Sequence, residues 1–235
     1  MTAPASTFPG GTSVSLLDVY DTVAPDGVAG GTPHLHLASA EAYVVTAGRG
    51  ELHTLGPNGV TVTPLEPGVV AWFTPGTIHR AVNLGGLAVV VVMQNSGLPE
   101  AGDAVMSFPL EHLADADRYA AVAALPVEAT QADADRRRDL AVQGFLSLRT
   151  AAEAGDLTPY RRFCDAAVAL VQPKAERWRE LWSDVVRAQV DVTDTVLADL
   201  AQGLGGHLAS AALTVRPAER RFGMCGRLRT FDVRG

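Results

Sequence analysis

The fold is decided by Gly31-Thr32-Pro33-His34-Leu35-His36-Leu37-Ala38-Ser39-Ala40-Glu41 and, further along, Thr74-Pro75-Gly76-Thr77-Ile78-His79. Side chains of an extended segment alternate between two faces, so His34 and His36 point to the same side of a strand. Glu41 follows at an odd step, and a bend or bulge over residues 37–40 is needed to return its carboxylate to the imidazoles. Three imidazoles and one carboxylate can hold a divalent transition metal and leave coordination positions open.

The spacing of these residues resembles the two signatures of the cupin superfamily over residues 12 to 107. The first signature corresponds to Gly30 or Gly31, His34, His36, Glu41 and Gly48, and the second to Gly68, Pro75, Gly76, His79 and Asn83. One departure is visible, because the family has proline two positions before this glycine and the chain has Thr74 there, with Pro75 directly before the glycine.

The resemblance implies a metal centre and a broad class of activity. It implies one divalent transition metal per chain on His34, His36, Glu41 and His79, with iron favoured and Mn, Ni, Co, Cu or Zn left open. Cupins of this kind include dioxygenases, isomerases, decarboxylases and lyases, and one scaffold hosts many functions.

Short apolar segments separated by glycine and proline run through residues 1–108 and predict an all-β domain. The expected strands are 13–19, 33–37, 41–46, 51–55, 60–65, 69–73, 77–83 and 87–94, with a tight turn at Gly48-Arg49-Gly50. With the resemblance, we expect a mainly β N-terminal cupin barrel, that is, a double-stranded β-helix or jelly roll.

Residues 109–235 change character and predict an α-helical C-terminal region. Helices are expected over 111–125 and 128–154, from Thr158 as N-cap onward, and from Pro173 to about Gln202. Segments 211–215 and 227–233 are expected to be extended, so the last 20 or so residues are expected to return to the sheet as a strand.

Other side chains carry competing interpretations. Tyr43 shares the face of Glu41 and is the candidate catalytic acid or base, although packing in the barrel accounts for it equally well. His53 is a weaker candidate near the centre. We expect one of Trp72 and Phe73 to face the cavity, with core packing favoured over a place in the wall of a substrate pocket. We expect Arg80 to point away from the cavity. The Trp178 and Trp182 face predicts helix packing, and Arg136-Arg137-Arg138 predicts a solvated helix face.

Composition narrows the classes of function. The net charge of −7 argues against a nucleic-acid partner, and no apolar run is long enough to cross a membrane. Residues 1–11 do not resemble a signal peptide, and the two cysteines, both outside the metal stretch, predict a reducing, cytoplasmic setting.

The charges are divided unevenly between the two halves of the chain. Residues 1–110 hold two arginines and eight carboxylates, a net charge of −6, whereas residues 216–235 have a net charge of +4. So few charges on a barrel predict that its outer surface is partly covered, by the helical half, by another subunit or by both. We therefore expect a homodimer.

The sequence predicts a metal-dependent enzyme acting on a small-molecule substrate, with oxidoreductase chemistry of the dioxygenase type favoured. The alternatives are a metal-dependent isomerase or lyase, and a non-catalytic module that binds or senses a small ligand.

Overall fold

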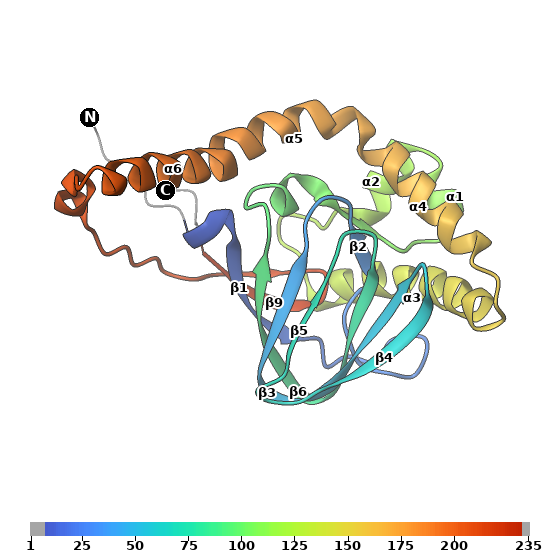
Figure 1. Ribbon diagram of the computed structural model, residues 1–235. Coiled ribbons are helices and arrows are strands. Elements are labelled where there is room, and N and C mark those ends of the chain that lie inside the picture. The colour runs from blue at the N-terminus through green and yellow to red at the C-terminus, as the bar shows by residue number, and fades with distance from the viewer. Residues whose placement is uncertain (1–7, 232–235) are drawn as a thin grey trace.

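A computed structural model describes residues 8–231 (Figure 1). Its N-terminal half contains the strands β1 (Ser13–Val19), β2 (His34–His36), β3 (Glu41–Gly56), β4 (Gly59–Leu65), β5 (Val70–Phe73), β6 (Ile78–Met93) and β7 (Ala104–Met106). Two further strands, β8 (Glu219–Phe222) and β9 (Gly226–Thr230), come from the C-terminal end. Within the described residues these strands form one antiparallel sheet of nine strands.

The sheet folds into two layers, and the two long strands β3 and β6 each pass from one layer to the other. The first half of β3 and the second half of β6 lie with β5, β1, β9 and β8 in what we name the β1 layer. The second half of β3 and the first half of β6 lie with β4, β2 and β7 in the β2 layer. Leu17, Tyr43, Leu52, Val89 and Val91 belong to the buried cluster between the layers.

The expected tight turn at Gly48–Gly50 is wrong, because β3 continues through it. The register of β3 on β6 shifts between Val45 and Gly50, so the strand bulges and passes from one layer to the other. Gly48 has φ 70°, and a Cβ there would lie 2.1 Å from the carbonyl oxygen of Gly86. The two strands expected over 77–83 and 87–94 are likewise one strand, β6.

The helices are α1 (Leu110–Leu113), α2 (Ala116–Ala123), α3 (Gln131–Glu153), α4 (Thr158–Val171), α5 (Ala175–Trp182) and α6 (Ala188–Ala201). A description as mainly β therefore fits only the N-terminal half. The single helix expected over 111–125 is two helices, and Thr158 is the first residue of α4 rather than its N-cap. No helix in the described part of the chain is long and apolar enough to cross a membrane.

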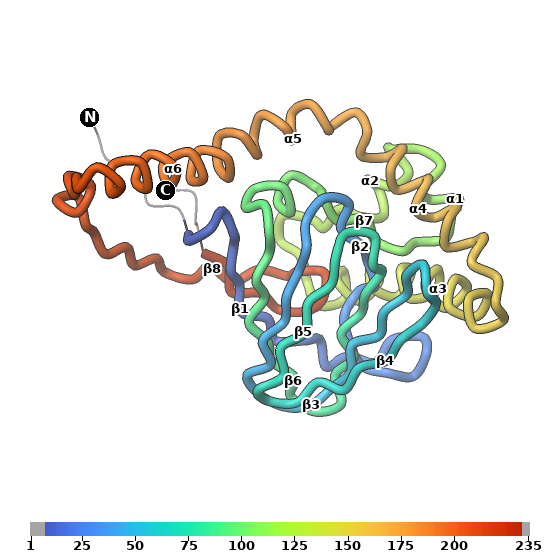
Figure 2. The backbone as a smooth tube through the Cα atoms, in the orientation of Figure 1, coloured from blue at the N-terminus to red at the C-terminus, as the bar shows by residue number. Residues whose placement is uncertain are grey.

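α3 and α4 cover the outer face of the β2 layer. Leu35, Leu55 and Ile78 point outward from that layer and pack in one buried cluster with Phe145 and Phe163. Trp178 of α5 is buried in the same cluster, which confirms the helix-packing interpretation. Beyond it, α5 and α6 form an arm that extends past the β1 edge of the barrel (Figure 2).

The prediction of a solvated arginine face on α3 is wrong for two of its three residues. Arg138 is fully buried and donates to the backbone carbonyls of Thr22 and Val23 at 2.9 and 3.2 Å. Arg137 donates to the carbonyl of Gly223 at 2.8 Å. Only Arg136 lies in solvent, paired with Asp133.

The C-terminal segment returns to the barrel as a hairpin. β9 pairs with β1 from Ser15 opposite Thr230 to Val19 opposite Gly226. The expected strand over 211–215 does not form, and residues 232 and 233 of the expected strand 227–233 lie outside the described residues. The hairpin thus covers the β1 edge, whose backbone groups would otherwise lack partners.

We expect Gly48→Ala to lower the free energy of unfolding by roughly 1–3 kcal/mol, because it combines a left-handed backbone with a close approach to Gly86. Gly56→Ala is the control, since Gly56 lies in the same strand with open space around it. Chemical denaturation measures both. Equal stability of the two variants would contradict the requirement for glycine at the bulge.

Deleting residues 216–235 removes β8 and β9, and we expect a clear fall in melting temperature because the β1 edge and the buried Cys225 lose their partners. Differential scanning calorimetry of the truncated chain measures this. A truncation that melts at the same temperature as the full chain would show that the hairpin adds nothing to barrel stability.

Candidate metal centre

The four predicted ligands meet inside the barrel. His34, His36, Glu41 and His79 are all buried, and one donor atom from each lies within 4.8 Å of the others. Glu41 Oε2 lies 3.2 Å from His36 Nε2 and 3.0 Å from His79 Nε2. His34 on β2 stands opposite His79 on β6, so strand pairing fixes the spacing of these two imidazoles.

Each imidazole is oriented by a contact of its Nδ1 atom. His34 Nδ1 lies 2.9 Å from the Thr32 carbonyl, and His79 Nδ1 lies 3.2 Å from the Thr77 carbonyl. A carbonyl oxygen can only accept, so in both rings Nδ1 carries the proton and Nε2 presents a lone pair to the centre. This is the tautomer that binds a metal through Nε2.

Asp103 is a candidate site residue that the sequence analysis missed. Its buried carboxylate lies 3.2 Å from His36 Nδ1 and accepts the backbone N–H groups of Leu37, Ala38 and Ser39 at 3.0, 2.7 and 3.1 Å. These bonds hold the predicted bend that turns Glu41 back to the histidines. No motif marks Asp103, because its position depends on the pairing of β7 with β2.

The charges at the centre are coupled. Burial and the neighbouring His79 and His36 lower the pKa of His34 well below its usual value. The pKa of His36 is raised to about 9, since the neighbouring carboxylates of Asp103 and Glu41 outweigh the effect of burial. The pKa of Glu41 is lowered, because His79 and His36 outweigh burial, so Glu41 is an ionised carboxylate at neutral pH.

The donor set fits a divalent cation. Glu41 Oε2 and the Nε2 of His79 are both buried without a hydrogen-bond partner. With the proton of His79 on Nδ1, two lone pairs face each other at 3.0 Å. Such an arrangement is costly in a buried site unless a cation lies among the donors, and imidazole with carboxylate suits a divalent transition metal.

Cys225, in the turn between β8 and β9, reaches the edge of this centre. Its Sγ lies 3.9 Å from His34 Nδ1 and 3.7 Å from the hydroxyl of Tyr43. Burial, together with the charge of Glu41, raises the pKa of the Cys225 thiol to about 12. Its position in the sequence, far from the metal stretch, gave no sign of this, because only the return of the C-terminal hairpin brings it there.

Tyr43 is fully buried between the layers, and burial raises the pKa of its hydroxyl well above the usual value. It does not line the cavity described below. Its role as a catalytic acid or base stays a prediction.

The other side chains considered in the sequence analysis differ in how they lie relative to the four donors. Phe73 packs on His79 with ring centroids 4.1 Å apart, whereas Trp72 is exposed. Arg80 points away from the centre and is held by Asp26 and the Gly31 carbonyl, as expected of a structural residue. His53 pairs with Glu51 at 2.7 Å and lies outside the group of four.

A cavity of about 410 Å³ opens onto His34, His36 and Glu41. Much of its wall is apolar and comes from both ends of the chain, with Leu17, Val91, Met93, Met224 and Leu228 among the lining residues. Ser96 also lines it. The C-terminal hairpin is therefore part of the site.

Comparison with known proteins supports the fold. Residues 19–94 match the family model described as "Cupin domain". No curated protein matches the chain significantly.

Three of the solved structures that match part of this chain are as follows. The capsular polysaccharide assembling protein CapF from Staphylococcus aureus is 20% identical over 42% of this chain and 27% of its own, with a TM-score of 0.33. A Cupin 2 conserved barrel domain protein from Salinispora arenicola is 22% identical over 43% of this chain and 76% of its own, with a TM-score of 0.30. KdgF from Halomonas sp. is 20% identical over 43% of this chain and 81% of its own, with a TM-score of 0.30. The chain thus spans about a quarter of the length of CapF.

We expect Asp103→Asn to weaken metal binding by roughly 10- to 100-fold, because the bend and the orientation of His36 both depend on this carboxylate. Glu51→Gln is the matched control, since Glu51 also pairs with a histidine, His53, but outside the centre. Competition with a chelator measures both affinities. An unchanged affinity in Asp103→Asn would show that the bend does not depend on this side chain.

Proposed function

We propose that this chain, which carries a cupin domain over residues 19–94, is a metal-dependent enzyme that transforms a small molecule. The observation that carries the proposal is the opening of a cavity of about 410 Å³ directly onto three of the four buried donors. A site that served only to stabilise the fold would be closed on all sides by protein ligands.

Nε2 of His34, His36 and His79 and the carboxylate of Glu41 would hold the ion. A divalent transition metal, for which we propose iron, supplies Lewis acidity, open coordination positions and one-electron chemistry when bound. The protein holds these donors through Asp103 and the Thr32 and Thr77 carbonyls, and the cavity wall limits the access of water.

The composition of the cavity favours oxidation of the dioxygenase type over isomerisation or elimination. Isomerisation and elimination need a group that accepts and returns a proton beside the substrate. Among the described lining residues, Glu100 accepts the N–H of Gly97 at 3.0 Å, and Glu219 is paired with Arg221. The remaining lining carboxylate, Glu41, belongs to the donor set.

The walls also limit the substrate. An apolar wall of leucine, valine and methionine suits a substrate with an apolar body. We propose a substrate of this kind, small enough for the cavity.

We expect His36→Ala to lose most of its bound metal and all turnover while it stays folded, because the hydrophobic core does not depend on the ion. His53→Ala is the control, as a histidine of the same barrel outside the donor set. Elemental analysis of protein purified without chelator gives the metal content, and circular dichroism gives the fold.

Oxygen uptake by the iron-loaded chain, with a panel of catechols, β-diketones and thiols, tests the reaction. Uptake that requires His36 supports the proposal. Turnover without oxygen uptake would instead indicate an isomerase or lyase, and tight binding of a panel compound without turnover would indicate a ligand-binding module.

A further inference from the structure

A second cavity lies on the outer side of the hairpin formed by β8 and β9. Its volume is about 560 Å³, which is in the range of sites that bind small molecules. The hairpin forms one wall, and the loop 125–129 between α2 and α3 forms the other. None of the four metal donors lines this cavity. It is therefore separate from the metal centre.

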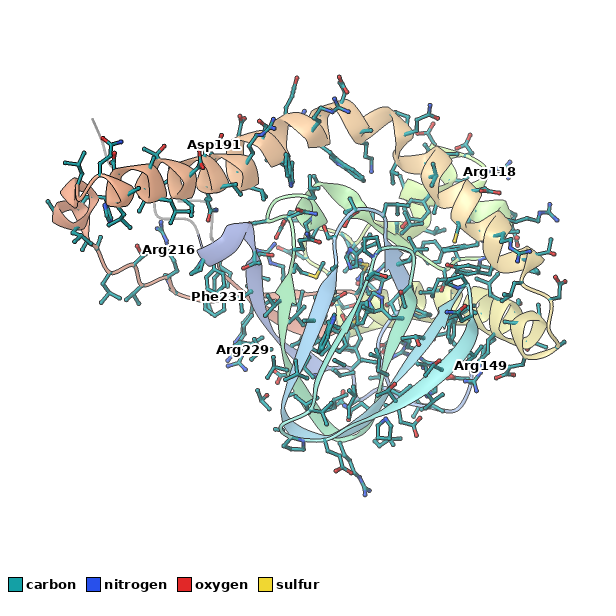
Figure 3. All side chains as sticks on the ribbon, viewed as in Figure 1. Arg118, Arg149, Asp191, Arg216, Arg229 and Phe231 are labelled. Carbon is teal, nitrogen blue, oxygen red and sulfur yellow. The ribbon has the colours of Figure 1, made fainter. Side chains whose placement is uncertain are left out.

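Strand alternation decides which side chains of the hairpin face the second cavity. Leu17 of β1 stands opposite Leu228 of β9, and both pack in the cluster between the layers. The residues on either side of Leu228 are Arg227 and Arg229, which therefore point outward. Arg229 extends away from the barrel (Figure 3), and Arg220 of β8 stands directly opposite it. Three arginines thus share the outer face of the hairpin.

The charges of these arginines are poorly neutralised by the chain itself. Within the described residues, no carboxylate oxygen lies within 4 Å of a nitrogen of Arg220 or Arg229. Arg227 reaches the carboxylate of Asp21 only at 3.8 Å. Like charges placed directly opposite each other on neighbouring strands are destabilising. An anion held between Arg220 and Arg229 removes this cost.

Other charged side chains also line the cavity. Arg221 is a fourth arginine, and it pairs with Glu219 at 3.3 Å. The carboxylates of Asp18 and Glu128 lie in the wall as well, and in the described part of the chain neither has a basic partner within 4 Å. Four arginines against two carboxylates leave the lining with an excess of positive charge, which attracts anions.

The rest of the wall is apolar. Phe222 stands opposite Arg227 on the outer face of the hairpin. The facing loop contributes Leu125, Pro126 and Val127. An aromatic ring and an apolar loop beside a cluster of guanidinium groups suit a ligand with an apolar body and one anionic head group.

Hydrogen bonds tie the two walls together. Arg137 of α3 donates to the carbonyls of Ala123 and Gly223 at 3.3 and 2.8 Å, so one side chain joins the start of the loop to the turn of the hairpin. Beyond the other end of the loop, Arg227 Nη2 donates to Gln131 Oε1 at 2.8 Å. These bonds hold the cavity open without a ligand, as expected of a preformed site.

We propose that this second cavity binds a small organic anion. Its phosphate or carboxylate head group lies between Arg220 and Arg229, and its apolar body packs on Phe222 and the loop 125–129. Guanidinium groups form paired N–H···O bonds with both kinds of head group. The inference does not rest on the proposed function, because the cavity contains none of the metal donors.

Isothermal titration calorimetry of the full chain tests the proposal. The probes are phenyl phosphate and benzoate, which carry the two head groups on the same apolar ring, and benzyl alcohol is the neutral control. We expect at least one of the two anions to bind, and benzyl alcohol to bind far more weakly. Binding of phenyl phosphate alone assigns a phosphate site, and binding of benzoate alone assigns a carboxylate site.

We expect Arg220→Gln and Arg229→Gln each to weaken binding of the anion about 10-fold or more, because each removes charge-assisted hydrogen bonds. Neither arginine lines the metal cavity, so a probe bound at the metal donors would not respond to these variants. Arg216→Gln is the matched control, since Arg216 is an exposed arginine of the same basic segment but lies outside the second cavity. We expect this control to retain the wild-type affinity, and circular dichroism checks that every variant is folded.

Four results would count against the proposal. Absence of binding by both anions would overturn it, as would equally tight binding of benzyl alcohol. An affinity that is unchanged in both Arg220→Gln and Arg229→Gln would place the anion elsewhere. Inorganic phosphate that binds as tightly as phenyl phosphate would overturn the role of the apolar wall.

Discussion

A buried carboxylate that faces an imidazole lone pair is the constraint around which this structure is arranged. Glu41 and His79 meet at 3.0 Å in an otherwise apolar interior, and a cation is the group that makes this contact favourable. The surrounding structure holds the four donors in place. The pairing of β2 with β6 fixes the spacing of His34 and His79. Asp103 holds the bend that brings the Glu41 carboxylate back to the histidines.

The C-terminal half completes a site that the cupin domain alone leaves open. Met224, Cys225 and Leu228 line the cavity, although they lie more than a hundred residues beyond the matched segment 19–94. Arg137 anchors the hairpin by donating to the Gly223 carbonyl, and Tyr20 of the barrel donates to the same carbonyl at 2.9 Å. Helices, hairpin and barrel are therefore coupled, and changes in the helices are expected to reach the cavity.

The sequence predicted the donors well because their positions follow from local rules. Alternation placed His34 and His36 together, and the odd step to Glu41 required the bend that the structure contains. Prediction from the sequence failed where a residue's position depends on the pairing of strands that are distant in the chain. The roles of Asp103 and Cys225 depend on β7 and on the β8–β9 hairpin, and Gly48 bulges instead of turning because β6 runs beside it. Because Arg137 and Arg138 are charged, we expected their side chains to be exposed to solvent. Instead, backbone carbonyls from distant parts of the chain accept their N–H groups.

X-ray absorption spectroscopy of the iron-loaded chain tests the central claim most directly, because it reports the atoms bound to the metal. The account predicts nitrogen and oxygen ligands at about 2.0–2.2 Å, with the outer-shell scattering of three imidazoles. A sulfur ligand at about 2.3 Å would instead place Cys225 on the metal. That result, or a spectrum with fewer than three imidazoles, would contradict a centre built from His34, His36, Glu41 and His79.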